Sequence, residues 1–386
     1  MNSKTRLTVL LASTPIIVLV LLGGFLNRVM AGQDTSYQHL RVFEDVVSLV
    51  VNNYVEKVDN ENIMRGALRG LAEGLDADSA WLTPAEAGVA GRGQGPAKGS
   101  VGLEVTRQYY LRVIAARDGS PAARAGLATG DYIRAINGTP TREMSAWAGR
   151  QALSGAPGSK VTLTVLRGNA AEPHEVTLVR EETSGATVSS RIVRPGVGLL
   201  RVAAFSDRTA TELRQQAIQL RKDGANHLIV DLRRTAEGSP ALGFGAAKLF
   251  VASGTLGSRE GRTVAKQVTA ASAGDGIITL PVTLLTDNGT SQAAEVFAAA
   301  LKGNKRATQV GERTLGRAAA QELVKLPDGS GLWISTSRFL SPDGTAIHEK
   351  GLTPDTAVAE PDSEFGAPAA DKDPILDKAL ELLPAA

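Results

Sequence analysis

The stretch QAAEVFAAALKGNKRATQVGERTLGR, from Gln292 to Arg317, decides how the fold of this chain is interpreted. It follows the apolar run PVTLLTD and opens with an Ala-rich run. A buried strand that leads into an apolar helix is typical of an α/β domain. The earlier runs VGLLRVAAF (Val197–Phe205), ELRQQAIQLRKDG and HLIVDLR repeat this alternation of strand and helix patterns. The part of the chain from about residue 192 onward is therefore predicted to form an α/β core.

The residues around this stretch resemble those of the C-terminal processing, or tail-specific, serine proteases. Members of that family carry Ser-Ala-Ser-Ala-Ser-Glu, then an Ala-rich helix, then Arg-Ala and Gly-Glu-x-Thr-x-Gly-Lys. The segment Leu284–Gln321 aligns with this pattern without gaps when Glu295, Arg306 and Gly311 serve as anchors. The resemblance implies a crotonase-like ββα protease core.

The two positions that would carry the chemistry of such an enzyme hold other residues here. The resemblance places the nucleophilic serine at Gln292 and its general base, a lysine, at Arg317, and an acidic residue often found between them falls on Gly303. A glutamine amide has no acidic hydroxyl, and an arginine stays protonated in proteins. We expect no catalytic residue at either position. We also expect Gln292 to begin a helix whose N-terminus faces Arg317, with the side chains hydrogen-bonded directly or through one water.

A third departure concerns the turn that would stabilise an oxyanion. The family pattern is Asp-Leu-Arg-x-Asn-Pro-Gly-Gly, in which a glycine turn presents backbone N–H groups to the charge. Here Asp231–Gly238 reads DLRRTAEG, and only Gly238 remains of the glycine pair. Side chains restrict the backbone of such a turn, and the carboxylate of Glu237 would oppose negative charge developing nearby. Gly238 is interpreted as the remnant of an oxyanion turn.

An alternative makes the chain an active serine endopeptidase that cleaves near substrate C-termini, with Ser291 or Thr290 as a shifted nucleophile. Lys302 and Lys305 would then be the candidate bases. However, Ser and Thr just before a helical pattern are most simply N-caps, which accept a hydrogen bond from the first turn. A shift of one residue at a helix start also turns the side chain by about 100°. We therefore prefer the capping interpretation.

Composition excludes several classes of function. The chain has 386 residues, 43% of them apolar, which allows two or three domains. It contains no cysteine, which excludes disulfides, thiolate zinc sites and cysteine nucleophiles. Its net charge of +2 gives no reason to expect nucleic acid as a partner. No cofactor or metal is expected, because the histidines lack metal-ligand spacing: His39, His174, His227 and His348.

The N-terminus carries the pattern of a membrane segment. Lys4 and Arg6 precede an apolar run, Leu7–Leu26, of about the length needed to cross a bilayer. Basic residues before such a run favour export of the rest of the chain. Val29 and Ala31 also suit a signal-peptide cleavage site, so residues 1–31 are interpreted as a signal anchor or signal peptide. This pattern predicts a bacterial-type inner membrane location, with the soluble part in the periplasm or outside the cell.

Residues 32–98 are predicted to form a small helical region that ends in a Gly-rich link. Apolar residues approximate helical spacing near its start: Leu40, Val42, Val46, Val47, Leu49 and Val50. The segment Asn53–Glu86 resembles the part of the same family that precedes a PDZ domain, where the pattern is Leu-Asp-Pro-His-Ser-x-Tyr-Leu. In this chain Ala77 and Asp78 replace the Pro and the His.

Residues 99–183 resemble a PDZ domain. The segment Ser120–Pro140 carries Ser-Pro-Ala, Ala-Gly-Leu, Gly-Asp-x-Ile and Ile-Asn-Gly. The run SVGL at 100–103 matches a loop whose backbone N–H groups bind a chain-terminal carboxylate, so that a peptide tail adds as a strand along the sheet edge. An ordinary strand start and a PDZ domain that is only a structural lid stay open as alternatives. The predicted peptide-binding residues are Val101, Gly102, Leu103 and Val105.

Together these patterns predict a multidomain α/β chain. Its expected parts are the membrane segment 1–31, the helical region 32–98, a β-rich PDZ domain at 99–183, the protease-like core 184–363, and a linker with a terminal helix at 364–386. The expected function is that of a membrane-anchored extracytoplasmic pseudoprotease, which binds C-terminal peptide tails and scaffolds or regulates. A homodimer or an active relative is the expected protein partner.

Overall fold

A computed structural model describes residues 37–93, 98–168, 172–182, 186–361, 364–365 and 372–384. The chain divides into two compact units, Met1–Gly70 and Leu71–Ala386. In the first unit, residues 37–53 are helical, as their apolar spacing predicts, and α2 (Asn60–Glu73) begins. The predicted membrane segment, Leu7–Leu26, lies outside the described residues. None of the helices in the described ranges is both long and apolar enough to span a bilayer.

The second unit opens with a short segment that joins a sheet of the protease-like core. After α2 come β1 (Ala80–Leu82) and α3 (Pro84–Gly91), which begins with a capping box between Thr83 and Glu86. Strand β1 pairs antiparallel with β19 (Gly331–Leu340). The order in this sheet is β1-β19-β14-β15, and β18 also pairs with β19. The remaining members are β14 (Thr255–Glu260), β15 (Gln267–Ala270) and β18 (Ala319–Lys325).

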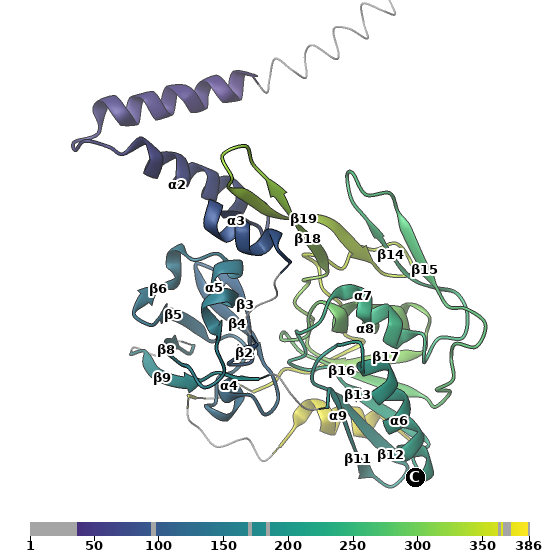
Figure 1. The fold of residues 1–386 in the computed structure, drawn as a ribbon. Coiled ribbons are helices and arrows are strands. Elements are labelled where there is room, and N and C mark those ends of the chain that lie inside the picture. Colours follow the sequence, from purple (N-terminus) through teal and green to yellow (C-terminus); the bar gives the residue numbers. More distant parts are fainter. Residues whose placement is uncertain are drawn as a thin grey trace, which may run out of the picture. The chain divides into compact units, whose positions relative to one another are not determined.

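The PDZ-like part is built on an antiparallel sheet of order β3-β4-β5-β8-β9, with β6 on β5. Helix α5 lies against β3, which is an edge strand of this sheet. Gly149 makes a close approach of α5 possible, because a Cβ there would lie 2.4 Å from Leu111. Figure 1 labels most of these elements. They are β2 (Gly99–Ser100), β3 (Leu103–Gln108), β4 (Tyr110–Ala116), α4 (Pro121–Arg124), β5 (Tyr132–Ile136), β6 (Thr139–Pro140), a 3₁₀ turn (Thr141–Glu143), α5 (Ala146–Leu153), β7 (Ser154–Gly155), β8 (Lys160–Leu166), β9 (His174–Val179) and β10 (Glu181–Glu182).

The protease-like core contains a six-stranded sheet of order β11-β12-β13-β16-β17-β20. All of its pairs are parallel except that of β11 with β12. The strand and helix patterns predicted for this region are confirmed. Its elements are β11 (Val188–Arg194), β12 (Val197–Val202), α6 (Thr209–Lys222), β13 (His227–Asp231), α7 (Pro240–Ala247), β16 (Val282–Thr286), α8 (Ala293–Gly303), β17 (Ala307–Gly311), β20 (Thr356–Ala357) and α9 (Pro374–Leu382).

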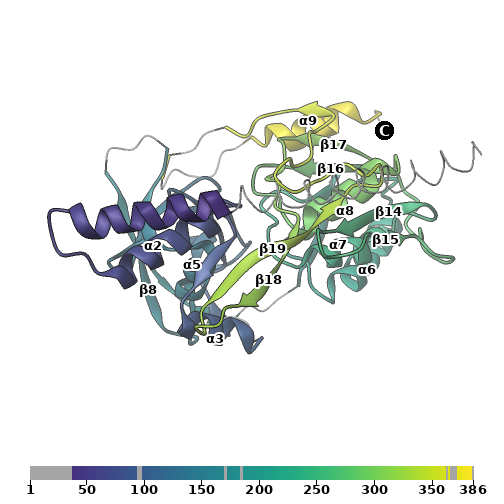
Figure 2. The same ribbon diagram turned by 90° about the horizontal axis from the view of Figure 1, so that it is seen from above.

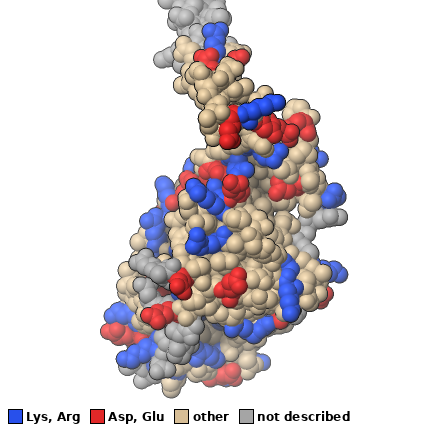
Figure 3. Space-filling model, turned by 90° about the vertical axis from the view of Figure 1, so that its left-hand side faces the viewer, with Lys and Arg blue, Asp and Glu red and all other residues tan. Residues whose placement is uncertain are grey.

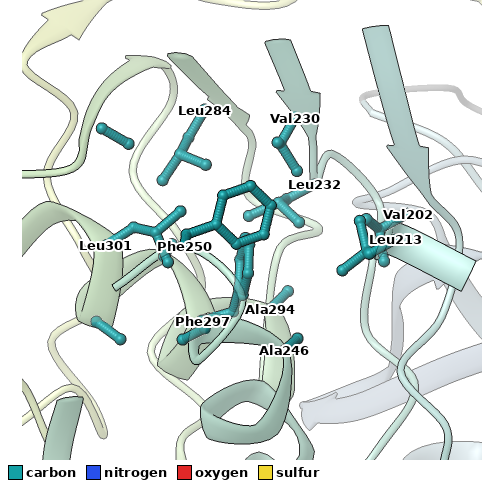
Figure 4. Packing of buried hydrophobic residues seen from close by; sticks show 14 of the residues in the cluster. Val202, Leu213, Val230, Leu232, Ala246, Phe250, Leu284, Ala294, Phe297 and Leu301 are labelled. Carbon is teal, nitrogen blue, oxygen red and sulfur yellow. The ribbon is translucent and has the colours of Figure 1, made fainter. Parts of the chain in front are cut away.

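Helices cover both faces of this sheet, because its strands are apolar on both sides. Leu200 and Leu228 belong to the cluster that includes side chains of α6, α7 and α8. The neighbouring residues Leu199 and Ile229 pack with α9 on the opposite face. Figure 2 shows α9 and α8 on opposite sides of β16 and β17. In Figure 4, Phe250 lies among apolar side chains of the strands and of α8.

The surface carries charges of both signs. On the face shown in Figure 3, basic and acidic side chains are interspersed over the described residues. This distribution agrees with the small net charge of +2 for the whole chain.

Candidate functional site

Helix α8 begins where the sequence predicts it to begin. Gln292 is its N-cap residue, with φ 55° and ψ −117°. A residue with a side chain rarely adopts a positive φ, and such strain concentrates at functional sites. In α/β-hydrolases a strained strand-to-helix turn presents the nucleophile. The backbone therefore holds residue 292 where a nucleophile could be presented, but the side chain at this position is an amide.

The carboxylate of Glu295 brings the two predicted positions together through their backbones. Its Oε2 accepts the N–H of Gln292 at 3.1 Å and the N–H of Arg317 at 2.8 Å. Its Oε1 accepts the Thr314 hydroxyl at 2.6 Å and the N–H of Gly316 at 2.5 Å. Burial raises the pKa of Glu295 to about 7, although these hydrogen bonds favour the charged form.

The guanidinium of Arg317 pairs with two carboxylates. Its Nε donates to Asp78, and its Nη1 lies 3.6 Å from Glu104 Oε2. The side chains of Arg317 and Asp78 are 7% and 5% exposed. Burial alone would lower the pKa of Arg317, but Asp78 and Glu104 raise it above its ordinary value. Arg317 is therefore held in the charged form and cannot accept a proton as a base.

The expected direct hydrogen bond between the side chains of Gln292 and Arg317 is not formed among the described residues. A charged guanidinium is better satisfied by carboxylates than by a neutral amide. Asp78 and Glu104 provide this pairing, and Arg150 lies 3.9 Å from the other oxygen of Asp78. The four residues form a charge cluster in which Arg317 and Asp78 are buried and Glu104 and Arg150 are partly exposed. One member lies before the PDZ domain, two lie within it and one lies in the core.

The alternative nucleophiles, Thr290 and Ser291, differ in their surroundings. The prediction that Ser291 or Thr290 is the N-cap of α8 is wrong, because Gln292 takes that position. The Thr290 hydroxyl lies 2.9 Å from the carbonyl of Leu232 and accepts the N–H of Asp287 at 3.1 Å. The Ser291 hydroxyl is buried and has no hydrogen-bond partner among the described residues.

Neither candidate lysine lies near the Ser291 hydroxyl. Lys302 is in the last turn of α8, about 15 Å along the helix from its start, and pairs with Asp355 at 3.0 Å. Lys305 follows the end of the same helix. A hydroxyl needs a base within hydrogen-bond reach to become a nucleophile, and these two lysines do not supply one.

The predicted oxyanion turn does lie beside the start of α8. The N–H of Ser291 donates to the carbonyl of Thr235 at 3.0 Å. Gly238 has φ 111°, and a Cβ there would lie 2.3 Å from the carbonyl oxygen of Phe205, so no other residue fits. The Glu237 carboxylate lies 3.0 Å from Arg117 of the PDZ domain. It is thus engaged in a salt bridge across the two parts of the unit.

A second ion pair joins the PDZ domain to β12, and an apolar contact joins it to the turn. Arg201 on β12 binds Asp118 through Nε at 2.7 Å and Nη2 at 3.1 Å. Ile114 and Ala115 of β4 share a buried cluster with Ala236 of the turn. The end of β4 therefore packs directly over the candidate oxyanion turn.

Sequence reasoning missed most of these interface residues. Arg117, Asp118 and Glu104 lie in the PDZ-like part and carry no motif of their own. Asp78 stands out in the sequence only as a departure from the family pattern. The sequence did contain one signal for the ion pair of Asp78 with Arg317, because both residues depart from the family pattern and carry opposite charges.

The predicted peptide-binding residues lie in the PDZ core. Val101, Leu103 and Val105 are buried members of one apolar cluster. Gly102 has φ 74°, and its N–H donates to the hydroxyl of Ser100 at 3.0 Å. A cavity of about 280 Å³ in the described part of the chain is lined instead by residues 73–77, Ser79, Arg107 and Tyr109. Whether the four residues bind a peptide stays a prediction.

No group of three or more His, Asp or Glu residues within the described ranges could hold a metal ion. His227 and His348 have separate surroundings. His227 Nε2 lies 3.0 Å from the Thr283 hydroxyl, and His348 Nε2 lies 3.9 Å from Asp76 Oδ2.

Comparisons with known proteins agree with the two predicted domains. The family model for peptidase family S41 matches residues 196–358, and that for the PDZ domain matches 112–167. The carboxyl-terminal-processing protease of Synechocystis sp. is 32% identical over 290 residues, which cover 73% of this chain and 68% of that protein. The carboxy-terminal-processing protease of Bartonella bacilliformis is 28% identical over 336 residues, which cover 85% and 77%.

A solved structure extends this likeness to the fold. The photosystem II D1 C-terminal processing protease superposes with a TM-score of 0.68 at 27% identity, covering 81% of this chain and 85% of that one. The α/β protease-like core and the PDZ domain predicted from the sequence are thereby confirmed. The chain belongs to the carboxyl-terminal-processing proteases of peptidase family S41.

Proposed function

We propose that this chain is a non-catalytic member of its family, a membrane-anchored pseudoprotease that binds C-terminal peptide tails through its PDZ domain. The apolar segment Leu7–Leu26 with its basic flank would anchor it, with the remainder in the periplasm or outside the cell. The protein would scaffold a complex or regulate an active relative, alone or as a homodimer.

One observation carries the proposal. Arg317, at the position of the general base, is buried in an ion pair with Asp78, while an amide occupies position 292. A base must exchange a proton near neutral pH, and a carboxylate partner makes this harder because it favours the charged form of a cation. Glu237, at a position of the oxyanion turn, is paired with Arg117. The nucleophile, the base and the oxyanion turn are thus all altered.

The alternative is an endopeptidase that uses Ser291. Its support is that the Ser291 hydroxyl, beside the start of α8, has no hydrogen-bond partner among the described residues. Against it, the hydroxyl is buried and both lysines considered as bases lie at the far end of α8. We therefore favour the non-catalytic function.

The test is cleavage of an unfolded protein with an apolar C-terminal tail, followed by mass spectrometry, with the full chain in detergent. The wild type is expected to cleave nothing, and Ser291→Ala to behave identically. Cleavage by the wild type that Ser291→Ala abolishes would overturn the proposal and identify the nucleophile.

Reversion variants sharpen this experiment. Gln292→Ser with Arg317→Lys restores both reactive groups, but Asp78 would still hold the new lysine protonated. Adding Asp78→His, the residue of the family pattern, removes that carboxylate. We expect the triple variant to cleave at least tenfold faster than the double variant, because deprotonation of the lysine is then easier. Equal rates would show that Asp78 has no part in silencing the site.

A further inference from the structure

The edge strand β3 and helix α5 form the place where a peptide tail would join the PDZ sheet. Peptides add to PDZ domains as an extra strand at a free sheet edge. Strand β3 ends the sheet order, and α5 lies against it. Access of a tail to this groove matters only if the PDZ domain binds tails, so the inference rests on the proposed function.

The chain's own segment Glu73–Ser79, here named the strap, lies beside both walls of the groove. Glu73 binds Arg107 on β3 with Oε2 to Nη1 at 2.6 Å, and these side chains are 17% and 22% exposed. Asp78 lies 3.9 Å from Arg150 on α5. The strap thus contacts the edge strand at one end and the helix at the other.

Apolar packing fixes the chain just after the strap. Ala80 and Leu82 of β1 are buried against Trp147 of α5. Strand β1 is hydrogen-bonded to β19 of the protease-like core, and Asp78 is bound by Arg317. The strap therefore connects the PDZ groove to the position of the general base.

Two buried polar atoms of the strap lack a hydrogen bond. The Ser79 hydroxyl and Glu73 Oε1 are buried without a hydrogen-bond partner among the described residues. Ser79 and Glu73 both line the cavity of about 280 Å³ between the strap and β3. A buried polar atom without a partner costs free energy, so this packing is less stable than a fully paired one.

We propose that the strap is an intramolecular competitor for the PDZ groove, so that a C-terminal tail binds only after Glu73 and Asp78 release Arg107 and Arg150. Release of Asp78 also removes a carboxylate partner of Arg317. Tail capture at the PDZ domain is thereby coupled to the arrangement of the protease-like site. The apparent affinity for a tail is reduced by the fraction of molecules in which the strap is closed.

The test measures tail binding by fluorescence anisotropy with the full chain in detergent. The probe is a labelled ten-residue peptide that ends in Leu-Ala-Ala with a free carboxylate, and its C-terminal amide serves as the specificity control. We expect Glu73→Gln with Asp78→Asn to bind the free-acid peptide about five- to tenfold more tightly than the wild type. Glu73→Gln alone, which alters a partly exposed pair, should give a smaller gain without risk to the fold.

Two further variants control the experiment. Glu73→Arg with Arg107→Glu restores an ion pair of reversed polarity and should return the affinity toward that of the wild type. Glu260→Gln disrupts the pair of Glu260 with Arg338, which are 3.0 Å apart on β14 and β19, and should bind as the wild type does.

Intrinsic fluorescence reports the position of the strap independently of the peptide. The chain has three tryptophans, and Trp147 is buried against the residues that come directly after the strap. Release of Asp78, two positions before Ala80, should loosen this packing and shift the emission to longer wavelength in the double variant. Unchanged affinity with unchanged emission would overturn the strap proposal alone. Shifted emission without peptide binding by any variant would overturn tail binding, and with it the competition.

Discussion

The interior of the protease-like core and its contact with the PDZ domain are held together by different forces. In the interior, Phe250 and Phe297 pack edge to face at 5.5 Å within an apolar cluster (Figure 4). At the contact, ion pairs of Arg317 with Glu104, Arg117 with Glu237 and Arg201 with Asp118 join the two parts. Apolar packing accepts many sequences, whereas a buried ion pair depends on both of its partners.

Three departures from the family pattern lie among the ion pairs and not in the apolar interior. The fold of the core agrees with that of the photosystem II D1 C-terminal processing protease. Asp78, Glu237 and Arg317 are departures, and each is in an ion pair between segments far apart in the sequence. These three departures from the family pattern thus also help to hold the PDZ domain and the preceding segment against the core.

The largest expected effect concerns the apolar interior of the protease-like core. Phe297→Ala should lower the free energy of unfolding by about 4 kcal/mol, because it leaves a cavity in a fully buried cluster. Urea denaturation measures the change. Val268→Ala, at a side chain 59% exposed, is the control and should change stability by less than about 0.5 kcal/mol. Similar losses for both would remove the distinction between interior and surface.

The next largest effect concerns the buried ion pair between Asp78 and Arg317. Asp78→Ala should cost about 3 kcal/mol, because it leaves the buried Arg317 without its main partner. Asp78→Ala with Arg317→Met should regain most of that loss, since the unpaired charge is gone. Urea denaturation of both single variants and the double variant gives the coupling between them. Additive losses would mean that the pair acts as two independent residues.

The third effect is a pH dependence of stability that comes from the buried carboxylate of Glu295. The folded pKa of Glu295, about 7, lies above its ordinary value of 4.5. Between these values the folded state binds more protons than the unfolded state, so stability falls as pH rises. We expect a loss of about 2 kcal/mol between pH 5 and pH 7.

Glu295→Gln is the matched variant for this prediction. It should reduce the slope of unfolding free energy against pH, measured by urea denaturation at several pH values. Burial also raises the pKa of Asp287, to about 6, so part of the slope will remain. A slope unchanged by the substitution would show that Glu295 does not titrate in this range.

The smallest expected effect concerns the partly exposed pair. Arg117→Gln should lower stability by about 1 kcal/mol or less, because the side chains of Arg117 and Glu237 are 12% and 27% exposed. The loss should shrink at high salt, whereas that of Asp78→Ala should not, since buried pairs are screened less. Unfolding in low and high salt compares the two. Equal salt sensitivity would contradict the assigned difference in burial.

Local patterns in the sequence were enough to predict most elements of the core. The apolar runs before Asp231 and Asp287 form buried parallel strands, because strands covered on both faces are continuously apolar. The helix that starts after Gln292 was predicted for a similar reason, from its apolar residues. The cap, predicted at Ser291 or Thr290, was misplaced by one or two residues, since the carboxylate of Glu295 accepts the N–H of Gln292. A cap depends on such a contact, and hydrophobic spacing does not reveal it.

The sequence by itself determined that residues 292 and 317 are an amide and a guanidinium, and this follows from side-chain chemistry alone. It also determined the order of the domains, because their motifs and apolar patterns are local. Only the tertiary structure decided that Arg317 faces Asp78, 239 positions away in the sequence, and that Glu237 faces Arg117. Charges on distant segments find each other through the packing of whole domains, which no local pattern records.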